Sequence, residues 1–406
     1  MISSTVSIHD VGHLPIWRRP FFLLALMAFA MPMAFATWSA LLNNFVHVVA
    51  GFDGRDLGWL QSVREIPGFF AVGVILVVMF IHEQLLAVVS MMLLAGIIAV
   101  TAWFPSFTGL LITTFLSSLG FHYYETVKMS LELQWLDKVE APKKLGWLIA
   151  IGSGASLITY LTIMLTWKVL GWDYNTLYMM GGGVTFAIAI YCGFVFPRFE
   201  GATTQHKHMV LRKRYWLYYA LQFMAGARRQ IFIVFAAFMM VERFGFEVHE
   251  VTALFLINFI ANMFFAPLMG SMVSKYGERN ALAFEYVGLI LVFLAYTGVY
   301  IFGWGVVLAA GLYVLDHLFF ALALAQKTYF QKIADPKDIG PTAAVAFTIN
   351  HIGAVVLPAL LGYVWLVSPA AVFGVATGMA CISLLLALLI PRHPVVGNET
   401  IFSGRN

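Results

Sequence analysis

Residues 142–146 read Pro-Lys-Lys-Leu-Gly, and residues 336–340, which lie 194 positions further along the chain, read Pro-Lys-Asp-Ile-Gly. The same offset places Gly-Phe-Asp at 51–53 onto Gly-Phe-Glu at 245–247. Each matched stretch falls in a short connection between apolar blocks. A constant offset without gaps at separate connections indicates an internal repeat, so the sequence predicts two similarly built halves.

The apolar blocks on either side of these connections are about as long as a membrane helix. The chain is 61% hydrophobic and only 11% charged, whereas soluble domains carry about 25% charged residues. About 20 apolar residues cross a bilayer core as a helix, and lipid offers no partner to an open backbone group. We therefore predict an all-α membrane protein with twelve transmembrane helices, at about residues 20–46, 57–80, 84–104, 106–135, 145–168, 174–197, 215–241, 248–273, 280–302, 304–331, 341–366 and 368–391.

The distribution of basic residues predicts which side of the membrane each connection faces. With the N-terminus in the cytoplasm, sixteen Lys and Arg fall on the cytoplasmic side and three on the opposite side. Basic residues are enriched in cytoplasmic loops, so we expect a multi-pass protein of the cell inner membrane with both termini cytoplasmic. The sixteen are Arg18, Arg19, Lys138, Lys143, Lys144, Arg198, Lys207, Arg212, Lys213, Arg214, Lys275, Arg279, Lys332, Lys337, Arg392 and Arg405, and the three are Arg55, Lys168 and Arg243.

The longest connection divides the chain into its two halves. It is basic, is predicted to be cytoplasmic and lies at the midpoint of the sequence. We expect an N-terminal six-helix half at 1–197, a basic linker at 198–214 and a C-terminal six-helix half at 215–406.

Composition also argues against several partners and cofactors. The net charge of +4 is small, and the basic residues are not gathered into a patch with aromatic residues, so we expect no nucleic acid partner. Cys192 and Cys381 lie inside apolar segments without metal-ligand spacing, and free Cys commonly acts as a small apolar packing residue. We expect no metal and no cofactor. The polar N-terminus, residues 1–19, is interpreted as a lead-in to the first span and not as a signal peptide.

The connection between the eighth and ninth predicted spans carries a recognisable motif. Residues 270–279 read Gly-Ser-Met-Val-Ser-Lys-Tyr-Gly-Glu-Arg, which resembles the cytoplasmic Gly-x-x-x-Asp-[Arg/Lys]-x-Gly-[Arg/Lys]-[Arg/Lys] motif of the major facilitator superfamily. Ser274 replaces the acid and Glu278 replaces a base. The resemblance, which extends over essentially the whole chain, implies two six-helix bundles related by a pseudo-twofold axis and a solute site where they meet near mid-bilayer. It also implies gating roles for Gly270, Lys275, Gly277 and Arg279.

The seventh predicted span has two adjacent arginines, Arg228 and Arg229, at its centre. An ionisable residue at this depth costs roughly 3 kcal/mol on insertion scales, and it marks a cavity or function. Arg229 shares a helix face with Gln222, so we expect it to face the cavity, while Arg228 can reach a neighbouring helix. An arginine fork suits a carboxylate or phosphate; alternatively, each arginine only neutralises an acid on another helix. The predicted substrate-binding residues are Arg228, Arg229, Arg64, Gln222, Asn258, Asn262, Asn350 and Tyr123.

A second set of residues inside the predicted spans can change charge. Acids and histidines at mid-depth are suited to carrying protons. The alternative interpretation of these residues is structural: Glu125 and Lys128 can form an ion pair along one helix, and a buried histidine can simply be satisfied in the core. The predicted proton-coupling residues are Glu125, Asp316, His317, His122 and Glu65.

The basic excess in the spans favours a small anionic or zwitterionic organic solute, and the titratable Glu125, Asp316 and His317 favour proton coupling. We therefore predict a proton-coupled secondary transporter that works by alternating access. We expect its partners to be this solute, protons and the lipid bilayer, and we expect it to be monomeric. Efflux of drugs or metabolites is one alternative, although the fifth span lacks the Gly-Pro signature of drug antiporters. Import of a transition metal such as copper is another, suggested by nineteen methionines. No HExxH, Ser/Lys dyad or Gly-rich phosphate loop is present, so we do not expect an enzyme.

Overall fold

The structure is a computed structural model that describes residues 5–8, 10–70, 73–78, 80–136, 141–200, 211–335 and 338–403. In this part of the chain nine helices are long and apolar enough to cross a membrane. They are Pro20–Val49, Glu83–Trp103, Trp147–Leu170, Tyr174–Val195, Lys213–Glu242, Glu278–Ile301, Val306–Ile333, Val345–Val367 and Pro369–Leu388. The fold is thus helical and suited to a membrane, as predicted.

Three of the twelve predicted spans are absent from those nine, so the structure does not confirm the count of twelve. Each of the three is nevertheless helical. The span predicted at 57–80 appears as α2 (Gly54–Phe69) and α3 (Gly73–Val78), the one at 106–135 as α5 (Phe107–Trp135), and the one at 248–273 as α10 (Val248–Tyr276). In α2 the reason is visible, because Arg55, Asp56, Arg64 and Glu65 lower its mean hydropathy.

The chain forms two compact units. Unit 1 comprises residues 1–51, 66–206 and 248–252, and unit 2 comprises residues 52–65, 207–247 and 253–406. The first part of α2 thus belongs to unit 2, with Arg64 and Glu65.

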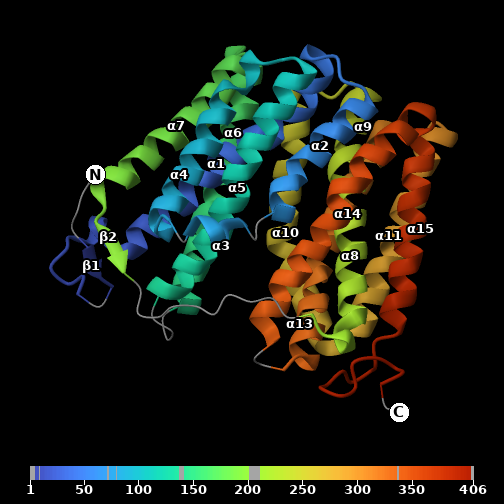
Figure 1. The fold of residues 1–406 in the computed structure, drawn as a ribbon. Helices are drawn as coiled ribbons and strands as arrows, with labels where there is room; N and C mark the ends of the chain where they lie inside the picture. Colours follow the sequence, from blue (N-terminus) through green and yellow to red (C-terminus); the bar gives the residue numbers. More distant parts are fainter. Residues whose placement is uncertain are drawn as a thin grey trace. The chain divides into compact units, whose positions relative to one another are not determined.

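Unit 1 is a helical bundle with a small parallel sheet (Figure 1). In addition to α5, it contains α1 (Pro20–Asn44), α4 (Glu83–Val100), α6 (Ala141–Leu165) and α7 (Tyr174–Val195). Helix α4 packs against α5 and α7, and α1 packs against α6 and α7. Strands β1 (Thr5–Ser7) and β2 (Arg198–Glu200) pair in parallel.

Unit 2 consists of α8 (Trp216–Gln230), α9 (Ala237–Glu242), α11 (Glu278–Ile301), α12 (Val306–Phe319), α13 (Leu324–Ile333), α14 (Ile339–Val367) and α15 (Pro369–Leu388), with most of α10. Helix α8 lies beside α14, and α11 lies beside α15 (Figure 1). These contacts bring the helix with the arginine pair next to the helix with Asn350.

The contact between α8 and α14 depends on glycine. A Cβ added to Gly226 would lie 2.0 Å from the carbonyl oxygen of Asn350. Small residues allow membrane helices to approach closely and pack backbone against backbone. Gly226 therefore holds the arginine pair close to α14.

The residues of the predicted gating motif surround the turn between α10 and α11. Gly277 has a φ of +80°, a conformation that a residue with a side chain rarely adopts. Gly270 and Lys275 lie in α10, and Arg279 lies in the first turn of α11. Next to Arg279, the carboxylate of Glu278 forms an ion pair with Lys332 at 2.7 Å, so the position that departs from the motif has a partner within unit 2.

Some positions used in the sequence analysis lie outside the described residues. They are Lys138, Lys207, Pro336, Lys337 and Arg405.

A candidate anion site in unit 2

The first of the two adjacent arginines is neutralised inside unit 2. The Nη2 of Arg228 donates to the Oε1 of Glu285 on α11 at 3.0 Å, and the two side chains are 4% and 1% exposed. The guanidinium also lies over the ring of Tyr286, 4.9 Å from its centroid. Arg228 therefore has an acid and an aromatic face as partners.

The second arginine has an amide as its partner. The Nη2 of Arg229 donates to the Oδ1 of Asn350 on α14 at 3.2 Å. In the part of the chain that the structure describes, no carboxylate lies within ion-pair distance of Arg229, although Glu65 acts on it electrostatically. An amide oxygen carries no net charge, so it does not neutralise the guanidinium.

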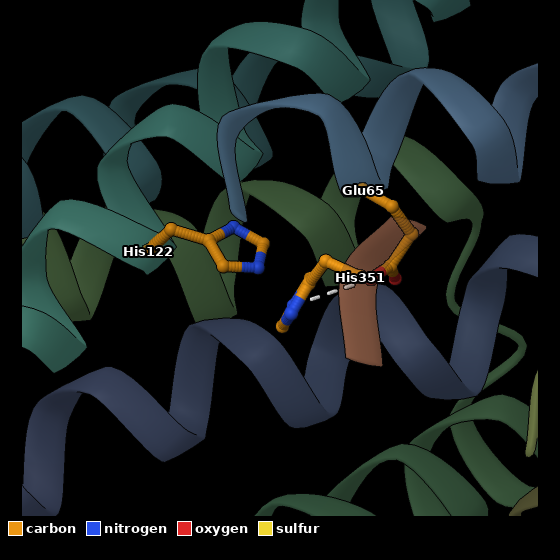
Figure 2. Close-up of side chains that lie close together, drawn as sticks. All are labelled: Glu65, His122 and His351. Atoms are coloured by element: carbon orange, nitrogen blue, oxygen red, sulfur yellow. Dashed lines mark ion pairs between the residues drawn. The ribbon is translucent and has the colours of Figure 1, made fainter. Parts of the chain in front are cut away.

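Glu65 is already engaged by two other groups. Its Oε1 lies 2.5 Å from Nη2 of Arg64, and its Oε2 lies 3.5 Å from Nε2 of His351 (Figure 2). The Nδ1 of His351 is 2.8 Å from the carbonyl oxygen of Phe347. Because a carbonyl can only accept, Nδ1 is the donor, so Nε2 donates to Glu65 only when the imidazole is protonated on both nitrogens.

These contacts leave an excess of positive charge. Arg64 and Arg229 bring two guanidinium groups to this region of unit 2, and Glu65 supplies one carboxylate. Two guanidinium forks with planar donors are well matched to a carboxylate or phosphate. We name Arg64, Glu65, Arg229, Asn350 and His351 the anion site.

A chain of hydrogen bonds, in which Gln222 takes part through both its backbone carbonyl and its side chain, links the anion site to Arg228. The Nδ2 of Asn350 donates to the carbonyl oxygen of Gln222 at 3.1 Å, and the Nε2 of Gln222 donates to the Oε1 of Gln326 at 3.0 Å. The Nε2 of Gln326 donates to the hydroxyl of Tyr286 at 2.9 Å. We name Asn350, Gln222, Gln326 and Tyr286 the amide chain. The amide chain connects Arg229 to Arg228, its neighbour in sequence, through residues on α14, α8, α13 and α11.

Helix α8, which carries the arginine pair, and helix α12, which carries Asp316, are each followed by an irregular turn. Immediately after Gln230, residues Ile231–Ala236 form a π-helical turn, and immediately after Phe319, residues Phe320–Ala323 form a 3₁₀ turn. π-Bulges and 3₁₀ stretches within longer helices often accompany functional sites and hinges. The two irregularities separate the charged parts of these helices from the segments that follow.

No protein-family model matches the sequence, and no curated protein matches it either. Solved structures do match. The nucleoside transporter NupG superposes with a TM-score of 0.72 at 15% identity, covering 90% of this chain and 98% of NupG. A transporter of the POT family, solved in complex with 5-aminolevulinic acid, gives 0.70 at 12% identity, with 94% and 97% covered. A bacterial homologue of the iron transporter ferroportin gives 0.72 at 10% identity, with 92% and 98% covered.

This chain shares its fold with these transporters, as the sequence resemblance implied. The matches cover nearly the whole of each chain, so the similarity is not confined to one half. Since the identities are between 10% and 15%, they establish the fold and leave the solute to be argued from the side chains of this chain.

Other predicted substrate residues make none of the contacts described above for the anion site. Asn258 and Asn262 are on α10, and the Oδ1 of each is buried without a hydrogen-bond partner among the described residues. Tyr123 belongs to unit 1, where its hydroxyl lies 2.9 Å from the position that a Cβ of Gly73 would take. The sequence placed all three in one site with the arginines, and that grouping stays a prediction.

The predicted proton-coupling residues fall into different surroundings. In unit 1, Nδ1 of His122 lies 3.0 Å from the hydroxyl of Ser118, and Glu125 forms an ion pair with Lys128 at 3.4 Å. In unit 2, the ring of His317 lies 6.4 Å from that of Phe232, and Asp316 is almost completely buried. Only Glu65 is part of the anion site.

The sequence analysis missed Glu285, the partner of Arg228. It is an acid inside the apolar segment predicted at 280–302, and the same rule that singled out Asp316 applies to it. Gln326 and Tyr286 of the amide chain were also missed, although the sequence analysis selected the neutral Gln222 and Asn350 of the same chain.

Outside the spans, ion pairs and hydrogen bonds stabilise the start of α14. The carboxylate of Asp338 accepts hydrogen bonds from Arg212 and from the hydroxyl of Tyr215. The Arg212 guanidinium, aided by Tyr215 and opposed by desolvation, holds the pKa of Asp338 below its usual range. A neighbouring pair, Arg214 and Asp335, lies 2.5 Å apart.

Proposed function

We propose that this protein is a secondary active transporter that moves a small anionic or zwitterionic organic solute by alternating access, coupled to protons. The observation that carries the proposal is the charge count of the anion site. Two guanidinium groups face one carboxylate there, and the partner of Arg229 is neutral. A carboxylate or phosphate on the solute supplies the missing negative charge.

The solved structures support transport as the activity class. NupG transports nucleosides, and the POT-family structure holds 5-aminolevulinic acid, a compound with one amino and one carboxyl group. A solute of that size and charge would pair its carboxylate with Arg229. In the anion site, Glu65 and the oxygen of Asn350 are acceptors within reach of an amino group.

The remaining features of the proposal follow from the sequence. They are twelve spans in two six-helix halves at 1–197 and 215–406, a basic linker at 198–214, cytoplasmic termini in the cell inner membrane, and a monomer. Proton coupling is assigned to titratable residues of the spans, with Asp316, His317 and Glu65 in unit 2 and Glu125 and His122 in unit 1.

Uptake of radiolabelled organic acids and amino acids into proteoliposomes tests this function. We expect uptake of at least one anionic or zwitterionic solute, increased by an inward proton gradient and abolished by Arg229→Gln. The variant Arg392→Gln is the matched control, since it removes one exposed positive charge outside the helices. Uptake that is indifferent both to the gradient and to Arg229→Gln contradicts the proposal.

A further inference from the structure

Asp316 is a buried carboxyl group that the anion site does not use. Its side chain is 1% exposed, and neither carboxylate oxygen has a hydrogen-bond partner among the described residues. Buried polar groups are normally hydrogen-bonded, so an acid in this state calls for a functional explanation.

Two packing contacts place Asp316 close to the ion pair of Arg228 and Glu285. The ring of Tyr313 lies 4.8 Å from that of Phe232, which is one turn after Arg228. The ring of Phe319 fills the space beside Gly288, 2.1 Å from where a Cβ of that glycine would lie. Gly288 is about one turn after Glu285, so α12 is fixed against both helices on either side of Asp316.

The groups that act on Asp316 lie on α8 and α11. Arg228 on α8 and Glu285 on α11 interact with it electrostatically, and so does Tyr296 on α11. On its own helix, His317 points toward the rings of Phe232 and Phe320. Among these groups Arg228 is the one permanent cation.

The charges of this cluster do not balance without a further positive charge. Arg228 contributes one positive charge, whereas Glu285 and Asp316 can contribute two negative charges. The guanidinium of Arg228 already pairs with Glu285 at 3.0 Å. A charge buried without a partner is costly. The cluster becomes neutral when it binds one proton, and a second proton is not required.

We propose that Arg228, Glu285 and Asp316 bind the single proton that is coupled to solute movement. This assignment rests on the proposed function as a proton-coupled transporter. When the proton is present, one carboxyl is neutral and the other pairs with Arg228; when it leaves, the two carboxylates compete for one guanidinium. The ring of Tyr286 lies under that guanidinium, so the amide chain carries a change in its position to Asn350 and Arg229.

Infrared difference spectroscopy tests this assignment without any solute. The purified protein in nanodiscs is titrated with acid and base, and the C=O stretch of protonated buried carboxyl groups is counted. Charge balance predicts one such group in the wild type, none in Asp316→Asn, none in Glu285→Gln and two in Arg228→Gln. Asp316→Glu keeps one, and Glu200→Gln is the matched control that also keeps one, because Glu200 is exposed and pairs with Arg198.

A wild-type band that survives in Asp316→Asn overturns the assignment, and so does an unchanged count in Arg228→Gln. Sodium added at constant pH is the second test, and loss of the band on its addition would show a sodium site in place of a proton site. Thermal unfolding of each variant identifies any that fails to fold, and Asp316→Glu then provides the comparison. Since no solute is present, the infrared result is independent of the uptake assay. Failure of uptake would contradict the proposed function, whereas a wrong number of protonated carboxyl groups would contradict the proton site.

Discussion

Arg228 and Arg229 are adjacent on α8, yet their guanidinium groups donate to two different helices, α11 and α14. Adjacent residues point about 100° apart on a helix, so one helix can present one arginine to an internal acid and the other to a solute. The two residues therefore have separable roles, and substitutions at them should have different consequences.

Replacing Arg229 should weaken binding of the solute. A hydrogen bond to a charged group contributes about 1.5–3 kcal/mol, so Arg229→Gln should raise the Kd of a bound organic acid by about 10- to 100-fold. Arg229→Lys should be intermediate, because it keeps the charge and loses the fork. Calorimetry with acids that stabilise the wild-type protein in a thermal-shift screen provides the measurement.

The control for this experiment is Arg392→Gln, which should leave the Kd unchanged. If Arg229→Gln and Arg392→Gln bind the acid equally well, Arg229 is not part of the binding site.

Replacing Arg228 should destabilise the protein more than replacing Glu285. Removing one partner of a buried ion pair costs about 3–5 kcal/mol, and Arg228→Gln leaves two buried acids without a cation. After Glu285→Gln, Asp316 remains as an acid that interacts electrostatically with Arg228. Thermal unfolding of both single variants and of the double variant in the same detergent gives their order of stability and the coupling energy between Arg228 and Glu285.

Equal losses of stability in the two single variants would show that Asp316 does not neutralise Arg228 when Glu285 is replaced. A double variant that is less stable than either single one would show that the pair is not coupled in the expected sense.

The sequence predicted the helical fold and the arginine pair for the same reason. The length of an apolar segment and the few charged residues inside it can both be read from the sequence without knowledge of tertiary contacts. Because charged residues are rare in such segments, a residue such as Arg229 is easily identified as a candidate. The amide chain was beyond this reasoning, because the bond from Gln222 to Gln326 joins residues 104 positions apart on different helices. The grouping of Arg64 and Glu65 with unit 2 was also missed, because the repeat assigns residues by chain order and not by contact.

Asp338 should make the stability of the protein depend on pH in acid. Its folded-state pKa lies below the usual value of 3.8, chiefly because Arg212 donates to it. A group with a depressed folded pKa stabilises the protein fully above its unfolded pKa and loses that effect as the pH falls through the folded pKa. Asp338→Asn should therefore lower the Tm at pH 7, and its difference from the wild type should shrink below about pH 4.

Asp335→Asn is the comparison for Asp338→Asn, because Asp335 is half exposed in its pair with Arg214 and exposed pairs contribute little. A Tm difference for Asp338→Asn that stays constant down to pH 3 would contradict the assigned role of the carboxylate.

Gly226 should be intolerant of even one added carbon. Because a Cβ there would lie 2.0 Å from the carbonyl oxygen of Asn350, Gly226→Ala must push α8 away from α14, and overpacking of this kind costs about 1–3 kcal/mol. The displacement would also move Arg229 relative to Asn350, so solute affinity should fall together with the Tm. Gly378→Ala on α15 is the matched control: nothing lies within 4 Å of its added Cβ, and alanine favours a helix over glycine by about 1 kcal/mol. Its Tm should stay level or rise, and a Gly226→Ala protein that behaves in the same way would show that the close approach of the two helices does not position the arginines.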